Sequence, residues 1–128
     1  MIQAGALQWQ CTTDAPSGVR IYRLRGVLTD SDESYAFLAR ARDDMRTDPR
    51  PLLLDLGAVE HVTSAGVGIV LAVYKSAAGA GRAIALAALS RRNEMILEIA
   101  QVPRFIAAFH DERTALESCA AGDWIRGS

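Results

Sequence analysis

The first part of the chain alternates between hydrophobic and polar residues, a pattern that predicts strands lying on a core. The stretches ALQWQCTT (residues 6–13) and VRIYRLRGVL (residues 19–28) both alternate, and the turn sequence APSG (residues 15–18) separates them. We expect the two strands to form an antiparallel hairpin, with Ile21 facing the core and Tyr22 facing outward.

A helical pattern follows this hairpin. Asp30 and Glu33 have the spacing of a capping box, so they predict a helix that starts after Asp30 and ends before Pro49. Its apolar stripe is predicted to comprise Tyr35, Leu38, Ala41 and Met45.

The middle of the chain predicts two buried strands around a long apolar helix. PLLLDL (residues 51–56) and AIALAAL (residues 83–89) are short apolar runs, as in strands that are covered on both faces of a sheet. A loop follows the first run, and a helix begins at Ser64 and ends at Gly79 and Gly81. Its core stripe is predicted to comprise Val67, Val70, Leu71 and Tyr74.

The last part predicts a helix, a short strand and a second helix. Ser90 caps the first helix, which stops at Pro103, and FIAAF (residues 105–109) is a short edge strand. Asp111 caps the last helix. The inward residues are predicted to be Met95, Ile96, Ile99 and Ala100 in the first helix, and Ala115, Leu116 and Cys119 in the second.

The elements therefore follow the order ββαβαβαβα, with about five strands and four helices. Because strands alternate with helices after the hairpin, we expect an α/β fold with a mixed, mostly parallel central sheet. A chain of 128 residues is predicted to form a single domain over residues 1–128, and residues 123–128 are predicted to fray because they lack periodicity.

Composition narrows the possible functions. The net charge of -1, with 23% charged residues, gives no basic excess, so we expect no nucleic-acid partner. The two cysteines are far apart, which favours thiols in a reducing compartment. The longest apolar run, residues 67–73, is too short to span a membrane, and the N-terminus does not resemble a signal peptide. We therefore expect a cytoplasmic protein.

The chemistry-bearing residues do not predict an enzyme. His61 lies three residues before Ser64, so a small Ser–His hydrolase is conceivable, but the nucleophile elbow needs a glycine where Val62 stands. The histidines and cysteines lack metal-ligand spacing, and the glycine pairs lack the remaining residues of a nucleotide-binding loop. We expect no catalytic residue, no metal and no cofactor. Asp55 is interpreted as a carboxylate that accepts hydrogen bonds from loop amides.

Ser64 is open to two interpretations. It is either a plain helix cap, whose hydroxyl accepts from the amide of Val67 or a neighbour, or part of an interaction surface. The residues that follow, 65–68, are small and apolar, which lets another chain approach closely. Apolar residues also lie off the predicted core stripe, so the helix is either wholly buried or half of an interface. These residues are Ile69, Ala72 and Val73.

The central sequence resembles a known family. Residues 52–87, LLLDLGAVEHVTSAGVGIVLAVYKSAAGAGRAIALA, are similar to the signature of STAS domains, in particular the anti-sigma factor antagonists of bacterial partner-switching systems. That signature is an apolar strand ending in Asp, an apolar loop, Asp-Ser-Ser/Ala/Thr-Gly-Leu-Gly and an apolar helix. LRGVLT (residues 24–29) and residues 90–118 resemble the flanking parts of the family, so the resemblance covers nearly the whole chain.

The resemblance implies a function and a set of site residues. In the family, the serine at the position of Ser64 is phosphorylated by a serine kinase of the histidine-kinase-like ATPase fold, which is also the anti-sigma factor. The unphosphorylated domain binds this kinase and releases its client, and a PP2C-type phosphatase resets the switch. The protein would be a monomer when unbound. The implied docking surface comprises Thr29, Asp30, His61, Val62, Thr63, Ser64, Ala65, Gly66 and Val67.

The sequence departs from the family at three positions. Thr63 stands where the family has the aspartate before the serine, and Val27 and Thr29 replace a glutamate and an aspartate. Thr63 is therefore a second, weaker candidate for the phosphate acceptor. Two alternatives also remain: a STAS subunit that docks without phosphorylation, as in a lipid or solute transport complex, and the small hydrolase with Ser64 and His61.

Overall fold

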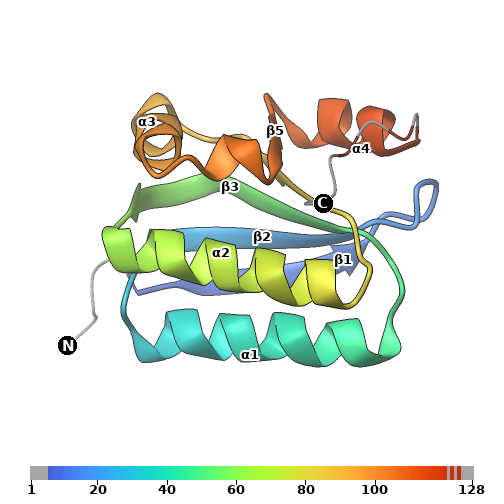
Figure 1. Ribbon diagram of the computed structural model, residues 1–128, viewed down its shortest axis with the longest axis horizontal. Coiled ribbons are helices and arrows are strands. Elements are labelled where there is room, and N and C mark those ends of the chain that lie inside the picture. Colours follow the sequence, from blue (N-terminus) through green and yellow to red (C-terminus); the bar gives the residue numbers. More distant parts are fainter. Residues whose placement is uncertain (1–5, 121, 123, 125–128) are drawn as a thin grey trace.

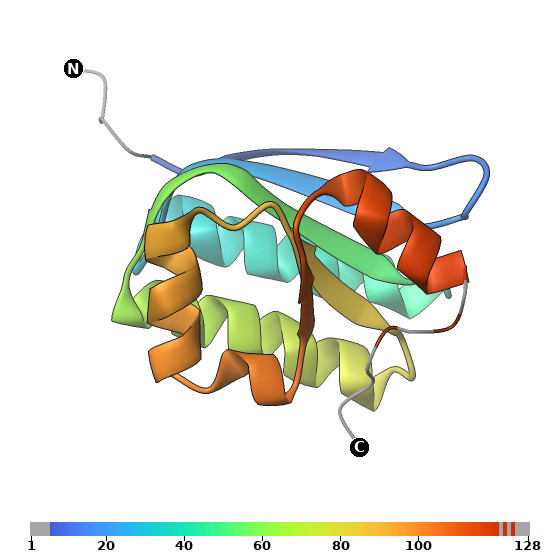
Figure 2. The same ribbon diagram turned by 90° about the horizontal axis from the view of Figure 1, so that it is seen from above.

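The computed structural model describes residues 6–120 together with Gly122 and Trp124, and it shows a five-stranded sheet with helices on both faces (Figures 1 and 2). In chain order the elements are β1 (Gln8–Thr13), β2 (Arg20–Leu28), α1 (Asp32–Thr47), β3 (Leu52–Val62), α2 (Ser64–Gly79), β4 (Ile84–Ala87), α3 (Arg91–Ile99), the 3-10 helix η1 (Val102–Arg104), β5 (Ala107–Phe109) and α4 (Glu112–Ala120). The sheet order is β1-β2-β3-β4-β5, antiparallel between β1 and β2 and parallel elsewhere. The predicted fold class and element order are confirmed.

The sheet carries a core on each face, which corrects the predicted orientation of Tyr22. Helices α1 and α2 cover one face and α4 lies over the other (Figure 1). Ile21 belongs to the core under α4, whereas Tyr22 is fully buried under α1, and its hydroxyl donates a hydrogen bond to Asp44 at 2.6 Å. Alternation along β2 therefore separates two cores, not a core from solvent.

Helix α1 buries three of the four residues of its predicted stripe, Leu38, Ala41 and Met45, whereas α3 buries a different face from the predicted one. In α1 the cap is Ser31, not Asp30, and Tyr35 is 52% exposed while Ser34 is fully buried. In α3, Met95 and Ile99 are 55% and 81% exposed, while Asn93 is fully buried. Ser34 and Asn93 both form hydrogen bonds with backbone groups close to the start of α2. These bonds keep the two polar side chains buried while apolar neighbours on the same helices stay exposed.

Helix α2 is nearly enclosed. Its buried residues include Ile69 and Val73, which the sequence placed off the core stripe, whereas the predicted core residues Leu71 and Tyr74 are only half-buried. Tyr74 packs against Phe105, with ring centroids 5.7 Å apart. Because α2 lies between the sheet, α1 and the segment around η1, it buries a wider face than a single stripe. Within the first two turns of α2, the exposed residues are Ser64, Ala65 and Gly68.

Strand β3 is longer than its apolar run predicted. It extends beyond Leu56 to Val62, although β4 pairs only with residues 52–55. The side chain of Asn93 takes the place of β4 along the remaining edge. Its amide donates to the carbonyl of Val59 at 3.0 Å, and its oxygen accepts from the amide of Val62 at 3.1 Å. The segment before Ser64 is therefore held as a strand and not as a loop.

The predicted caps of the later helices are confirmed, and one residue of the predicted tail is fixed. Ser90 accepts from the amide of Asn93 at 3.1 Å, and Asp111 accepts from the amide of Thr114 at 2.8 Å. Trp124 is buried and donates from its indole to the carbonyl of Ala115 at 2.8 Å. The rest of the segment 123–128 lies outside the described residues.

The end of β2 packs directly against the start of α2. The amide of Thr63 donates to the carbonyl oxygen of Leu28 at 3.1 Å. A Cβ atom on Gly66 would lie 2.1 Å from that oxygen and 2.8 Å from the Leu28 carbonyl carbon. Only glycine allows this approach, so Gly66 sets how closely α2 meets the sheet.

A charged cluster attaches α4 to the opposite face. Arg23 on β2 donates two hydrogen bonds to Glu112, at 2.7 and 2.8 Å. The neighbouring Asp55 accepts from the amide of Gly57 at 2.8 Å, as the sequence predicted for a loop-bonding carboxylate. Burial, followed by the carboxylate of Glu112, raises the pKa of Asp55 to about 6. Arg23 lowers the pKa of Glu112.

Replacing Gly66 by alanine should destabilise the protein, whereas the same change at Gly68 should not. The new methyl group of Gly66→Ala overlaps the Leu28 carbonyl, and overpacking of this kind costs about 1–3 kcal/mol of the free energy of unfolding. A Cβ at Gly68 meets nothing within 4 Å, so Gly68→Ala should gain up to about 1 kcal/mol from helix propensity. Urea denaturation of both variants measures the difference, and equal effects would contradict the close approach at Gly66.

The Asp55 cluster should make stability depend on pH between about 4 and 7. Because the folded state holds the Asp55 proton more tightly than the unfolded chain does, this group stabilises the fold at low pH and loses that contribution as pH rises through about 6. Asp55→Asn keeps an acceptor for Gly57 and a donor toward Glu112 at every pH. We expect the melting temperature of the variant, relative to the parent, to rise between pH 5 and pH 7.5.

Asp43→Asn is the control for this measurement, because Asp43 is an exposed carboxylate on α1 that is far from α4. Its melting temperature relative to the parent should stay constant over the same range. Parallel pH profiles for the parent and Asp55→Asn would rule out the titration of Asp55.

Candidate functional site

The predicted site residues meet at one edge of the sheet, where β2 and β3 end and α2 begins (Figure 1). Thr29 and Asp30 follow β2, residues 61–62 complete β3, and Ser64, one residue after Thr63, is the first residue of α2. Because β2 and β3 are parallel, their carboxyl ends lie side by side, and Leu28 is the partner of Val62. This is the edge at which ligands and partners commonly meet an α/β sheet.

Thr63, and not Ser64, is the cap of α2, which corrects the sequence interpretation. Its hydroxyl oxygen accepts from the amide of Gly66 at 3.1 Å and donates to the hydroxyl of Thr29 at 2.8 Å. The amide of Thr29 in turn donates to the buried hydroxyl of Ser34 at 3.2 Å. The threonine that replaces the family aspartate therefore performs the capping role and ties α2 to the loop after β2.

This leaves the hydroxyl of Ser64 available. Ser64 is exposed at the first helical position, and Ala65 beside it is also exposed. The first turn of α2 contains no acidic residue. The first amide groups of a helix have no acceptor within the helix, and the helix dipole favours an anion there. An anionic group on Ser64 would therefore meet favourable backbone electrostatics.

The structure separates the nine predicted docking residues into accessible and buried ones. Ser64, Ala65 and Asp30 are exposed, while Thr29, His61 and Thr63 are half-buried. The other three cannot present side chains to a partner in this structure, because they are buried: Val62, Gly66 and Val67. These three support the surface from below.

His61 does not form a pair with Ser64. Among the hydrogen bonds of the described residues, none joins the two side chains, and the buried Nδ1 of His61 has no partner. Val62 packs in the core between the sheet and α2. Because successive strand residues point to opposite faces of a sheet, His61 points to the face away from α2. The geometry offers no base for the Ser64 hydroxyl.

Sequence reasoning missed two kinds of residue at this edge. Ser34 and Asn93 are polar residues buried beside it, and no local pattern marked them. Met95 and Ile99 form an exposed pair that we call the apolar flank of α3. Their neighbours Glu94 and Glu98 face β5, and the apolar flank lies about a quarter turn further round α3, on the side exposed to solvent. Figure 2 shows α3 at the same end of the molecule as the start of α2.

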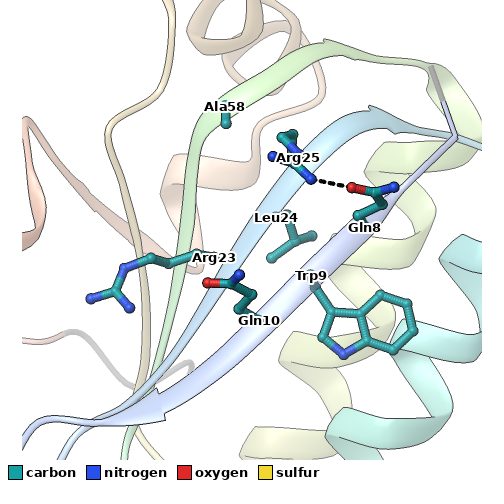
Figure 3. Close-up of a pocket in the computed structure, with 7 residues that line it drawn as sticks. All are labelled: Gln8, Trp9, Gln10, Arg23, Leu24, Arg25 and Ala58. Atoms are coloured by element: carbon teal, nitrogen blue, oxygen red, sulfur yellow. Dashed lines mark hydrogen bonds between the residues drawn. The ribbon is translucent and has the colours of Figure 1, made fainter. Parts of the chain in front are cut away.

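A separate hollow lies away from this site, on the open part of the sheet over β1, β2 and β3 (Figure 3). Its volume is about 410 Å³, and Gln8, Gln10, Arg23 and Arg25 contribute most of its polar groups. Arg25 donates to Gln8 across it. It contains no nucleophile beside a base, and it does not include Ser64.

Two further observations concern metal binding and membrane crossing. The described residues contain no cluster of three side chains that could hold a metal ion. None of the helices within residues 6–120 is both long and apolar enough to cross a membrane.

Solved structures share this fold at low sequence identity. An anti-sigma-factor antagonist (STAS) domain protein from Planctomyces limnophilus matches with a TM-score of 0.74 and 18% identity, over 88% of this chain and 97% of that chain. The anti-sigma factor antagonist SpoIIAA matches in its unphosphorylated form with a TM-score of 0.66 and 17% identity, over 88% and 98%. The phosphorylated form of SpoIIAA from Bacillus gives 0.68 and 14%, over 88% and 99%.

The murine anion transporter Slc26a9 also contains a region of this fold, with a TM-score of 0.70 and 18% identity over 82% of this chain and 18% of that chain. The sequence matches no curated protein sequence. The profile of the STAS domain matches residues 10–115, which is most of the chain and includes Ser64. The chain therefore belongs to the STAS domain family.

Proposed function

We propose that this protein is a phospho-regulated partner-switching module of the anti-sigma factor antagonist type. In its unphosphorylated state it docks, as a cytoplasmic monomer, on a serine kinase of the histidine-kinase-like ATPase fold and displaces the client of that kinase. Phosphorylation of Ser64 ends the docking, and a PP2C-type phosphatase restores it. The observation that carries the proposal is the exposed hydroxyl of Ser64 on a helix that Thr63 already caps.

The electrostatics of this position suit a switch that changes binding but not folding. A phosphate on Ser64 adds about -1.5 to -2 charges at the positive end of α2, where anions stabilise helices by about 0.3–1 kcal/mol. Under a docked partner the same charge would lose its water, at a cost of several kcal/mol unless it is paired. Since each 1.4 kcal/mol is a tenfold change in affinity, the loss of binding is large.

The hydrogen bonds favour Ser64 over Thr63 as the acceptor. The Thr63 hydroxyl is half-buried and bonded to Gly66 and Thr29, so a kinase would have to break the cap to reach it. Ser64 can be reached without any such change. The replacement of the family aspartate therefore removes a charge beside the acceptor but keeps the geometry of the turn.

The proposed docking surface is small and mostly uncharged. It joins Ser64, Ala65 and Gly68 at the start of α2 to the apolar flank of α3. Ile99 is 81% exposed, and contiguous exposed apolar surface is typical of interaction sites. A partner that covers both elements would place Ser64 near the middle of the interface, where an added charge is most disruptive.

A second candidate function is supported by the similarity to a region of the anion transporter Slc26a9. A STAS domain in a transport complex would use the same edge for permanent docking. In that case Ser64 would serve as a contact residue and would not be modified.

Phosphorylation by a kinase of the proposed class distinguishes these two functions. We expect incubation with ATP and a histidine-kinase-like serine kinase encoded beside this protein to add one phosphate, measured by intact mass. Ser64→Ala should abolish the gain, and Thr63→Ser, which keeps the capping oxygen, should not. No mass gain, or a gain that persists in Ser64→Ala, would contradict Ser64 as the acceptor.

A fixed charge at Ser64 should weaken docking and leave the fold intact. Ser64→Glu places a carboxylate at the favourable end of α2, so its melting temperature should equal or exceed that of the parent. Binding to the same kinase, measured by calorimetry, should weaken at least tenfold.

Ala78→Glu is the matched control, since it adds the same charge to an exposed position at the other end of α2. It should lower the melting temperature slightly, because a carboxylate is unfavourable at a helix C-terminus, and it should leave kinase binding unchanged. Equal affinities of Ser64→Glu and the parent would refute the charge mechanism.

A further inference from the structure

A second hollow, of about 240 Å³, lies between α3, η1, the end of β4 and the start of β5. Its floor is apolar, and the floor residues are almost completely buried: Leu86, Leu97, Val102 and Ile106. In Figure 2, α3 and η1 lie beside β5 on this side of the molecule. Met95 and Ile99 do not line the hollow, so it lies on a different flank of α3 from the apolar flank.

Two carboxylates stand at the rim of this hollow. Glu94 and Glu98 are one turn apart on the same side of α3, and both are exposed while lining the hollow. Among the ion pairs of the described residues, none uses either of them, although Arg104 on η1 is nearby in sequence. Their charges are therefore directed at the space above an apolar floor.

We propose that this hollow is a pocket for one basic side chain, a lysine or an arginine, of a protein partner. Pockets for small-molecule ligands usually measure about 300–1,000 Å³, so the hollow is too small for most metabolites but has room for one long side chain. Lysine and arginine have an apolar stem that packs on apolar surface and a cation that stays at the rim. This is the arrangement that the floor and the two carboxylates complement.

The pocket goes beyond the proposed function, because it lies on a different flank of α3 and needs no change at Ser64. A basic side chain bound in this pocket would fix the orientation of its protein relative to α3. Charge pairs of this exposed kind contribute mainly to orientation and to the rate of association.

Three four-carbon probes with different end groups test the proposal on the intact protein: n-butylammonium, 1-butanol and butyrate. Amide shifts in two-dimensional NMR should map n-butylammonium to Glu98, Val102 and Ala108, with a dissociation constant of about 1–10 mM for so small a ligand. Butanol should bind roughly fivefold more weakly, and butyrate should not saturate.

Two sets of variants separate charge from shape. The double variant Glu94→Gln with Glu98→Gln should bind butylammonium and butanol equally, whereas Glu117→Gln, which removes an exposed charge on α4, should keep the preference. Ala108→Leu, at an exposed lining position, should fill the hollow and abolish binding of all probes. The proposal is overturned by shifts that do not saturate, by butyrate binding as tightly as butylammonium, or by a preference that survives the double variant.

Discussion

The contact between the carbonyl of Leu28 and the start of α2 is the constraint on which the site depends. It brings the end of β2 within hydrogen-bonding distance of Thr63 and leaves no room for a side chain at Gly66. Because this approach fixes α2 from below, the opposite side of its first turn faces solvent. The exposure of Ser64 is therefore a consequence of how tightly the backbone beneath it is packed.

Two buried polar side chains hold the backbone on either side of the start of α2. Ser34 accepts from the amide of Thr29 on the α1 side, and Asn93 bonds to Val59 and Val62 on the α3 side. Each satisfies backbone groups that the sheet leaves without a neighbouring strand. The surface around Ser64 is thus supported by fixed hydrogen bonds from three elements. A partner that binds such a preformed surface spends little free energy on ordering it.

The sequence was informative where a pattern is local and uninformative where it depends on distant residues. The order of elements, the buried strand at residues 52–56 and the caps Ser90 and Asp111 all follow from short-range signals, and they agree with the structure. The family signature placed Ser64 at the start of α2. The continuation of β3 to Val62 was missed, because it depends on pairing with the end of β2 and on Asn93, which lies about thirty positions further along the chain.

The face of α3, and one position in the face of α1, were misjudged for the same reason. Tyr35, Met95 and Ile99 looked like core residues, yet the buried positions went to Ser34 and Asn93, whose partners no sequence period reveals. The cap of α2 was assigned one residue late, since threonine and serine are both good caps and only the bond from the Gly66 amide to Thr63 distinguishes them. Because Thr63 forms the capping bond, the hydroxyl of Ser64 takes no part in it and stays exposed.

The replacement of an acidic residue by Thr63 has a consequence for how the molecule responds to acidity. An ionised cap loses its acceptor strength when it takes up a proton, but a hydroxyl bonds in the same way from acid to alkali. The first turn of α2 is thus held by groups that do not titrate, whereas the attachment of α4 on the far side relies on two carboxyl groups and a guanidinium. Lowering the pH therefore changes the protonation of the groups that attach α4 and leaves the cap of α2 unchanged.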